Sequence, residues 1–368
     1  MPVSKHIIEL AYQLFLGREP ESAEVVAHKA LHLNSLAEVR DDFMRSVEFL
    51  SASASVTETI NSHLESHLTQ SDNPKIQVEG AASELDSYEG TACIETEMRL
   101  AREATIEIGS KKYVISSDDS YLDYIGNGFE PEMVVLFGVL ASRDDVVLDV
   151  GANIGCTAIL FGELCRSVCA FEPSFTTFAF LEKNVANSGL RNVILRNIGL
   201  GEDAGEYTLI SHPSNRSGSF VSNRVQASPG HTLEKIVIRR LDDTVESMNL
   251  PKIDLIKIDV EGFEGHVLRG ATRTLSSCRP LVVLELNHWC LNAFQRVSIP
   301  DFLDFLRSRF PILLAVDGSS YLNLHDAGES YIVMYHHILQ MRFPNIVAAF
   351  DEVRLSRFRD SYRHHFVA

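Results

Sequence analysis

Three side chains able to move a proton follow short apolar runs in the second half of the chain. Asp259 and Glu261 come directly after the run from Ile253 to Ile258, and His288 follows the run from Leu281 to Leu286. A carboxylate or imidazole beside a substrate hydroxyl can orient that hydroxyl or accept its proton. Two carboxylates can also hold a divalent cation, but a third ligand is not evident, and Glu261 can instead cap the helix expected next. We therefore expect Asp259, Glu261 and His288 to act on a substrate, and we expect no metal site.

A glycine-rich turn precedes these residues. The segment from Val146 to Gly155 predicts a buried strand that turns directly into a helix. Gly151 permits a tight turn, and Gly155 permits close packing of the helix on the strand. Asn153 stands where many nucleotide-binding loops have another glycine, and asparagine tolerates a left-handed backbone. Such a turn alone is a weak indication of a ligand site.

The ends of the following apolar runs add polar groups. Glu172 ends the run from Val168 to Phe171, about 20 residues beyond the glycine turn, where an acidic residue can bind ribose hydroxyls. Asn197 and Gly199 follow the next run and are placed to flank a base. Ligands of open parallel sheets bind beyond the carboxyl ends of the strands. The four strand ends therefore predict one crevice.

Together these motifs resemble the signature of FkbM-type methyltransferases, over about residues 120 to 335. The stretches that carry the resemblance are Leu148-Asp-Val-Gly-Ala-Asn-Ile-Gly155, Phe171-Glu-Pro173, Leu241-Asp-Asp243, Ile256-Lys-Ile-Asp-Val-Glu-Gly262, Val267-Leu-Arg-Gly-Ala271 and Pro280-Leu-Val-Val-Leu-Glu285. The resemblance implies S-adenosylmethionine as methyl donor and usually a hydroxyl group as acceptor. A nicotinamide dehydrogenase would instead show Gly-x-Gly-x-x-Gly, which this turn lacks.

The resemblance also implies roles for single residues. Asp149 would orient the methionine portion of the donor, and Glu130 resembles the acidic residue that precedes the sheet in this family. Alternatives stay open: Asp149 can brace the turn, Glu172 can be a carboxylate favoured by the dipole at a helix N-terminus, and Glu130 can be a surface carboxylate. Asn197 and Gly199 can instead belong to a plain turn between a strand and the next element. The expected donor-binding residues are Glu130, Asp149, Gly151, Ala152, Asn153, Gly155, Glu172, Asn197 and Gly199.

Composition limits the class of partner. The chain has 33 basic and 50 acidic residues, a formal charge of −17, which argues against a nucleic-acid backbone. No stretch approaches the roughly 20 apolar residues that cross a bilayer, and no secretion signal is evident. The six cysteines form no Cys-x-x-Cys pair and are expected to be reduced. These features favour a cytoplasmic enzyme, and the N-terminal resemblance described below implies a bacterial one.

Alternating strands and helices predict an α/β fold, a doubly wound and mostly parallel sheet. We expect helices near 156–165, 174–187, 264–276 and 299–309, and strands at Leu281–Leu286, Ile312–Val316 and Tyr331–Tyr335. The last two runs lack an intervening helix of sufficient length and predict an antiparallel edge hairpin. The polar segment His212–Pro229 lies between expected strands, and either a lid or a disordered insertion is consistent with it.

The first 90 residues differ from the rest. Helical spacing predicts a module over residues 1–50, and a segment rich in Ser, Thr, Glu and Asn predicts a linker over 51–90, ahead of a catalytic domain over 91–368. The stretches Tyr12-Gln-Leu-Phe-Leu-Gly-Arg-Glu-Pro20 and Phe43-Met-Arg-Ser-Val-Glu-Phe49 resemble a bacterial helical module, of the LGREP type, that is related to phycobilisome linker domains. That module often accompanies glycan-modifying enzymes, and it can serve docking or formation of a homo-oligomer.

The sequence therefore predicts an O-methyltransferase that acts on a sugar, a glycan or a glycosylated small molecule. The hydroxyl acceptor rests on the family resemblance, and the sugar rests on the association with the N-terminal module. The alternative is a scaffold that binds the donor without catalysing transfer.

Overall fold

The computed structural model describes residues 5, 8, 12, 20–33, 42, 101–212, 214–222, 227, 230–250 and 252–364. The chain divides into two compact units, Met1–Cys93 and Ile94–Ala368. In the first unit, α2 (Ala23–His32) begins after Ser22, whose side chain accepts a hydrogen bond from the Val25 N–H. Most of the module expected over 1–50 and all of the linker expected over 51–90 lie outside the described residues.

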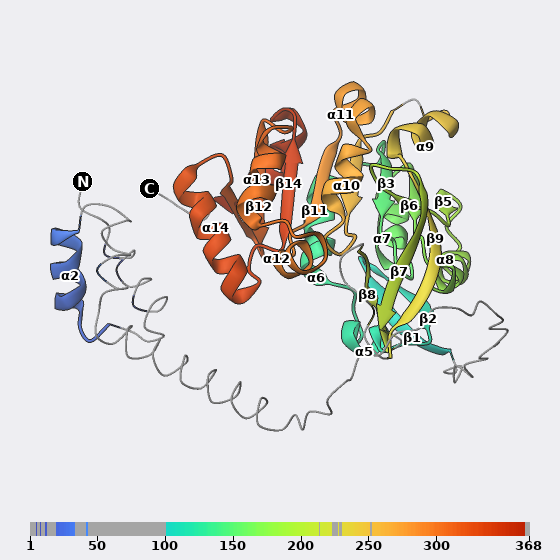
Figure 1. Cartoon of the computed structure of the whole chain (residues 1–368), viewed down its shortest axis with the longest axis horizontal. Helices are drawn as coiled ribbons and strands as arrows, with labels where there is room; N and C mark the ends of the chain where they lie inside the picture. Colours follow the sequence, from blue (N-terminus) through green and yellow to red (C-terminus); the bar gives the residue numbers. More distant parts are fainter. Residues whose placement is uncertain are drawn as a thin grey trace, which may run out of the picture. The chain divides into compact units, whose positions relative to one another are not determined.

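A nine-stranded sheet forms the centre of the second unit, in the order β15-β13-β12-β14-β11-β10-β3-β4-β5 (Figure 1). The strands are β3 (Val146–Val150), β4 (Ser167–Phe171), β5 (Val193–Arg196), β10 (Leu255–Ile258), β11 (Leu281–Glu285), β12 (Ile312–Asp317), β13 (Ser320–Asn323), β14 (Asn345–Ala349) and β15 (Arg363–His364). The five strands from β11 to β5 are parallel, and β14 is antiparallel to both of its neighbours. The strand order reverses between β3 and β10, where an open α/β sheet opens a crevice for a ligand.

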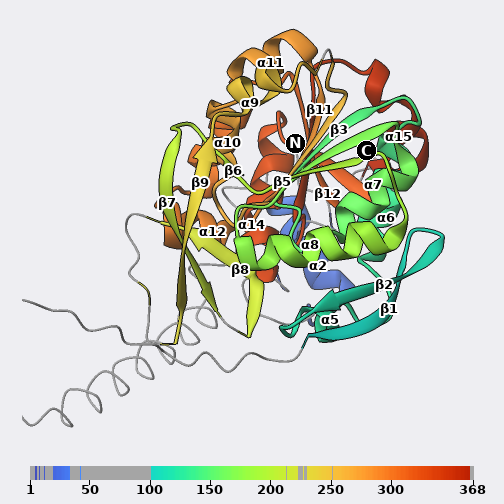
Figure 2. The ribbon, with the colours of Figure 1, turned by 90° about the vertical axis from the view of Figure 1, so that its right-hand side faces the viewer.

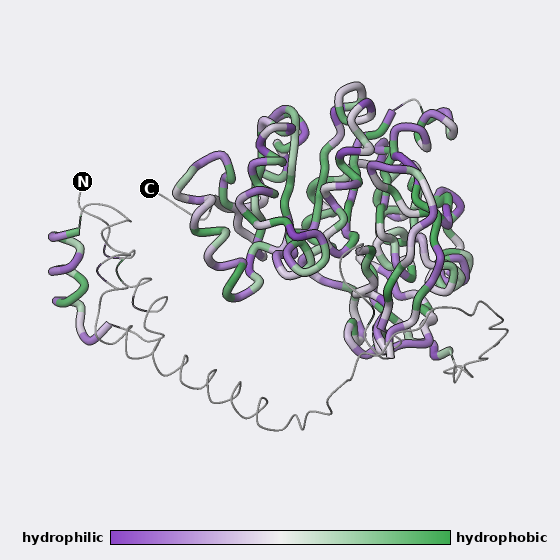
Figure 3. The backbone as a smooth tube through the Cα atoms, in the orientation of Figure 1, coloured by the Kyte–Doolittle hydropathy of each residue, from purple (hydrophilic) through white to green (hydrophobic). Residues whose placement is uncertain are grey.

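Helices cover both faces of this sheet (Figures 1 and 2). Successive residues of a strand point to opposite faces, so Val147 packs into one hydrophobic core and Leu148 into the other. The α-helices that contribute to the first core are α5 (Tyr121–Ile125), α6 (Pro131–Leu140), α7 (Cys156–Leu164), α8 (Phe175–Ser188) and α15 (Ser356–Ser361). Those that contribute to the second are α9 (Leu241–Ser247), α10 (Glu264–Arg269), α11 (Thr272–Cys278), α13 (Ile299–Arg307) and α14 (Ala327–Gln340). The strands β11 and β14, whose residues are mostly buried, are mostly apolar (Figure 3). The expected doubly wound α/β fold is confirmed.

Two smaller sheets lie beside the main one. The hairpin of β1 (Arg102–Ile108) and β2 (Lys111–Ser117) packs against α8, where the buried Asn184 amide accepts from the Ser116 N–H and donates to the Ser116 and Ile154 carbonyls. A four-stranded sheet has the order β6-β9-β7-β8. Its strands are β6 (Gly199–Leu200), β7 (Gly205–His212), β8 (Asn215–Val221) and β9 (Thr232–Arg239).

The structure corrects three expected elements. Tyr331–Tyr335, expected as a strand, lies inside α14, where Ser330, Val333 and His337 are buried at helical spacing. The expected edge hairpin is therefore wrong: β12 pairs with β13 and β14 instead. The single helix expected over 264–276 is two helices, α10 and α11. An ideal Cβ on Gly270, between them, would lie 2.0 Å from the Gly201 carbonyl oxygen, so only glycine fits there.

Among the helices that the structure describes, none is both long enough and apolar enough to cross a lipid bilayer.

Candidate functional site

The glycine turn after β3 is shaped by contacts with its neighbouring strands. The N–H groups of Gly151 and Ala152 both donate to the Phe171 carbonyl at 3.0 Å. Gly151 has φ +80°, and an ideal Cβ there would lie 1.8 Å from the Asp259 carbonyl oxygen. Asn153 has the expected left-handed backbone, with φ 48°. The glycine at 151 is thus required by the close approach of the β10 end.

Glu172 ties the end of β4 to this turn. Its Oε2 accepts from the Asn153 N–H at 3.1 Å, and its Oε1 accepts from the Ser174 N–H at 2.9 Å. Burial raises the pKa of Glu172 to about 7, although both backbone N–H groups favour the charged form. A carboxylate with lone pairs left over can accept further hydrogen bonds from a ligand.

Lys257 joins the ends of β3 and β10. The residue is only 4% exposed. Its ammonium donates a hydrogen bond to the Gly151 carbonyl at 2.7 Å and lies 3.4 Å from a carboxylate oxygen of Asp149 and from one of Asp259. Burial lowers the pKa of Lys257, but Asp259 and Asp149 raise it more, so the side chain stays charged. Asp149 is fully buried, and the carboxylate has no described partner besides this lysine. This arrangement agrees with the alternative in which Asp149 braces the turn.

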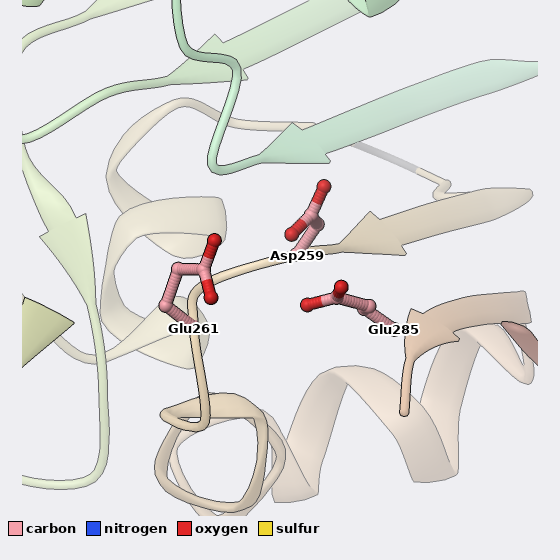
Figure 4. A group of neighbouring side chains, drawn as sticks. All are labelled: Asp259, Glu261 and Glu285. Atoms are coloured by element: carbon pink, nitrogen blue, oxygen red, sulfur yellow. The ribbon is translucent and has the colours of Figure 1, made fainter. Parts of the chain in front are cut away.

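Three carboxylates gather at the ends of β10 and β11 (Figure 4). Asp259, Glu261 and Glu285 each offer an oxygen atom within 4.8 Å of the others. Glu261 lies in a left-handed backbone conformation, with φ 51°, and its Oε2 accepts a hydrogen bond from the Cys290 thiol at 3.0 Å. Burial, with Asp259 nearby, raises the pKa of Glu261 to about 7, and the same causes raise the pKa of Glu285 well above its usual value. Glu261 and Glu285 are therefore weaker acids than an exposed glutamate.

Glu264 stabilises the loop that carries Asp259 and Glu261. Glu264 is fully buried, and its Oε1 accepts from the Val260 and Gly262 N–H groups at 3.2 and 3.1 Å. Burial raises the pKa of Glu264 to about 8. The helix α10 begins without a side-chain cap from its N-cap residue, Phe263, and the Glu261 carboxylate considered as a cap accepts from the Cys290 thiol instead.

A hollow of about 450 Å³ opens over these elements, within the roughly 300–1,000 Å³ usual for small-molecule sites. Its polar wall is formed by the glycine turn, Glu172 and the three carboxylates, and its apolar wall includes Ile198, Leu200, Ile238 and Phe263. Part of the polar segment expected as a lid or an insertion is the strand β8, and residues 215–219 of it line the hollow. Arg216 there forms an ion pair with Asp118 and lies 3.8 Å from Asp119.

The structure brings most of the predicted site residues together. The predicted residues that line the hollow are Glu130, Gly151, Ala152, Asn153, Glu172, Gly199, Asp259 and Glu261. Those that do not line it are Asp149, Gly155, Asn197 and His288.

The residues outside the hollow have other contacts. Gly155, with φ +102°, allows α7 to approach Leu181 of α8. The Asn197 amide donates to the Glu172 and Pro173 carbonyls. The His288 ring packs edge-on against His337, and burial lowers its pKa.

Two residues of the site were missed from the sequence. Lys257 interrupts an apolar strand, and a charge within a buried run is a signal that can be found without a structure. Glu285 ends the run from Leu281, as Glu172 ends an earlier run. Glu285 is also the third carboxylate of the group, which was not evident from the sequence.

A family model described as Methyltransferase FkbM domain matches residues 149–310, less than half of the 368 residues. Over this segment the chain is similar to FkbM-type methyltransferase domains. The resemblance of the N-terminal module stays a prediction, since its motifs lie largely outside the described residues.

The chain is similar to several named methyltransferases. Hexuronic acid methyltransferase AglP of Haloferax volcanii is 33% identical over 158 residues, which cover 43% of this chain and 62% of that protein. 2-O-methyltransferase NoeI of Sinorhizobium fredii is 29% identical over 160 residues, 39% of this chain and 64% of that protein. 31-O-demethyl-FK506 methyltransferase FkbM of Streptomyces tacrolimicus is 30% identical over 162 residues, 36% of this chain and 62% of that protein. The matches span about three fifths of the length of these relatives.

Proposed function

We propose that this chain transfers a methyl group from S-adenosylmethionine to a hydroxyl of a sugar, a glycan or a glycosylated small molecule. The observation that carries the proposal is one hollow lined by two chemically different groups of residues. The glycine turn and Glu172 form one group, and Asp259, Glu261 and Glu285 form the other. The first group suits a nucleoside, and the second suits a hydroxyl that must lose a proton.

The glycine turn and Glu172 have the groups that a nucleoside donor requires. Glu172 would accept hydrogen bonds from the ribose hydroxyls, and its two backbone partners already fix the orientation of its carboxylate. Ile198, Leu200 and Phe263 would flank the base, and residues 151–153 would follow the rest of the donor. When bound, S-adenosylmethionine supplies an electrophilic methyl group on a sulfonium cation. The acidic lining of the hollow is electrostatically suited to such a cation.

The three carboxylates supply a base for the acceptor hydroxyl. A general base is most effective when its pKa lies near the working pH, and that of Glu261 is about 7. Glu261 would accept the proton of the hydroxyl, while Asp259 and Glu285 orient it. The three carboxylates interact, so they titrate as a group. His288, expected as a further candidate, has no place in this proposal because it does not line the hollow.

The acceptor class rests on the relatives. Two of them are named for action on hexuronic acid and for 2-O-methylation, and a third for O-methylation of FK506. We propose a bacterial cytoplasm as the place of action, supported by five free cysteines in the described part of the chain. The N-terminal module would dock to a partner or to a second copy.

Methyl transfer from labelled S-adenosylmethionine to bacterial polysaccharide precursors tests the proposal. E261Q should lower kcat by about 10² to 10⁴-fold, because it removes the base, with unchanged donor affinity. The control E182Q changes an exposed carboxylate of α8 that lines neither the hollow nor the turn, and should retain full activity. The proposal fails if no hydroxyl-rich acceptor is methylated although the donor binds, which favours the scaffold.

A further inference from the structure

A second hollow, of about 360 Å³, adjoins the first at the carboxyl ends of β10, β11 and β14. Tyr124, Glu130, Lys257, Asp259 and Glu285 line both hollows. The second hollow extends from these shared residues to Pro344 and Asn345. Since β3 and β11 flank β10, it lies across β10 from the glycine turn.

The ionisable groups of the second hollow are mostly acidic. The carboxyl groups of Glu130, Glu132, Asp259 and Glu285 line it, and Lys257 supplies the one cation among its described lining residues. The Lys257 ammonium is held by the Gly151 carbonyl and lies between two aspartates. It is therefore already matched with negative charge before any ligand enters.

The first hollow offers no compensating charge. Its other described cation, Arg216, forms an ion pair with Asp118 and donates a hydrogen bond to Thr177. An anionic ligand entering from either side would lose its hydration beside acidic groups, without an unmatched cation in the described lining.

We infer that the second hollow takes the acceptor and selects a sugar without negative charge over a uronate or a sugar phosphate. The inference rests on the proposed function. Hydroxyl groups of a neutral sugar can donate to these acidic groups or accept from them in either protonation state, whereas an added carboxylate or phosphate finds no unmatched cation in the described lining. The Asn345 and Tyr124 side chains provide neutral hydrogen-bonding groups at this hollow.

Matched acceptor pairs test the inference in the full chain. Methyl glucoside, methyl galactoside and methyl mannoside are each compared with the corresponding methyl uronoside, using labelled S-adenosylmethionine. Wild type should show at least about tenfold higher kcat/KM for the neutral member of a pair. For a pair without turnover, calorimetric titration in the presence of S-adenosylhomocysteine gives the same comparison of affinities.

Charge reversal at the wall of the second hollow provides the matched variant. Glu132 is an exposed residue of α6, and E132R should raise kcat/KM for uronosides and shrink the preference at least threefold. The control E182R makes the same charge change outside both hollows and should leave the preference unchanged. A uronoside used or bound as well as its neutral partner overturns the inference but leaves the proposed function standing. An unchanged preference in E132R also overturns it. Donor binding without methyl transfer to any acceptor, including polysaccharide precursors, overturns the proposed function and the inference with it.

Discussion

Glu172 connects stability of the glycine turn with recognition of the donor. Its carboxylate is buried and already accepts two backbone hydrogen bonds, so a ligand that adds hydroxyl donors meets a fixed acceptor. Because the pKa of Glu172 in the protein without a ligand is about 7, donor binding and ionisation of this carboxyl are linked near neutral pH.

The pH dependence of donor affinity tests this role. Ribose hydroxyls donate to the ionised form, so affinity should be constant above pH 8 and weaken as the pH falls through about 7. E172A should lose about 1–3 kcal/mol of binding free energy at pH 8, and this pH dependence with it. Calorimetry at pH 6 and pH 8 measures both effects, with thermal unfolding as a check on folding. Equal affinity of wild type and E172A at pH 8 would exclude Glu172 from the donor site.

Single residues of the site were predictable where a motif or a strand end marked them. Glu172 and Asp259 follow apolar runs, and the structure places both at the hollow. Glu285 was missed as a third carboxylate because its proximity to Glu261 depends on the adjacency of β10 and β11. The sequence gives no pairing of strands.

At the scale of elements, the loop between β10 and α10 holds the carboxylates in position. Glu264 is fully buried, and its Oε1 accepts hydrogen bonds from two backbone N–H groups of the loop. Its Oε2 has no described hydrogen-bond partner. Burial raises the pKa of this carboxyl to about 8, so the folded state favours its protonated form.

The stability of the loop should therefore depend on pH. In the unfolded chain Glu264 ionises near pH 4.5, so its contribution to stability is complete below that pH and is lost as the pH rises to about 8. The loss amounts to at most about 1.4 kcal/mol per pH unit. E264Q keeps an accepting oxygen but cannot ionise, so its free energy of unfolding should fall less between pH 5 and pH 8 than that of wild type.

Urea unfolding at the two pH values measures this difference. E264A, which also loses the acceptor for two N–H groups, should be about 1–3 kcal/mol less stable than wild type at pH 5. Parallel pH profiles of wild type and E264Q would show that Glu264 is not the titrating group.

Apolar periodicity predicted the helices whose buried residues recur at helical spacing. It failed where a short apolar run is compatible with either a strand or a helix. The helices α7, α8 and α13 follow their apolar spacing, and their expected positions are confirmed. The run from Tyr331 to Tyr335 has as many apolar residues as a buried strand, and only its packing reveals the helix. The break between α10 and α11 falls at Gly270, where the close approach of Gly201, far away in the sequence, leaves no room for a side chain.

At the scale of the whole molecule, the two units are expected to have separate roles, donor binding in one and docking in the other. The donor-binding residues proposed above all belong to the unit Ile94–Ala368. A chain that starts near Ser87 should therefore fold and bind S-adenosylmethionine with unchanged affinity. Acceptor use or oligomeric state should respond to the truncation if the module docks to a partner or to a second copy. Calorimetry and light scattering on both chains measure these properties, and loss of donor affinity in the shorter chain would place part of the donor site in the first unit.

The central claim is that the hollow beside Glu172 binds S-adenosylmethionine, and titration calorimetry of the full chain tests it most directly. We predict that one S-adenosylmethionine and, in a separate titration, one S-adenosylhomocysteine bind per chain. NAD⁺ should give little or no heat at the same concentrations, because the glycine turn lacks the Gly-x-Gly-x-x-Gly pattern. Binding of NAD⁺ together with no binding of S-adenosylmethionine would contradict the account.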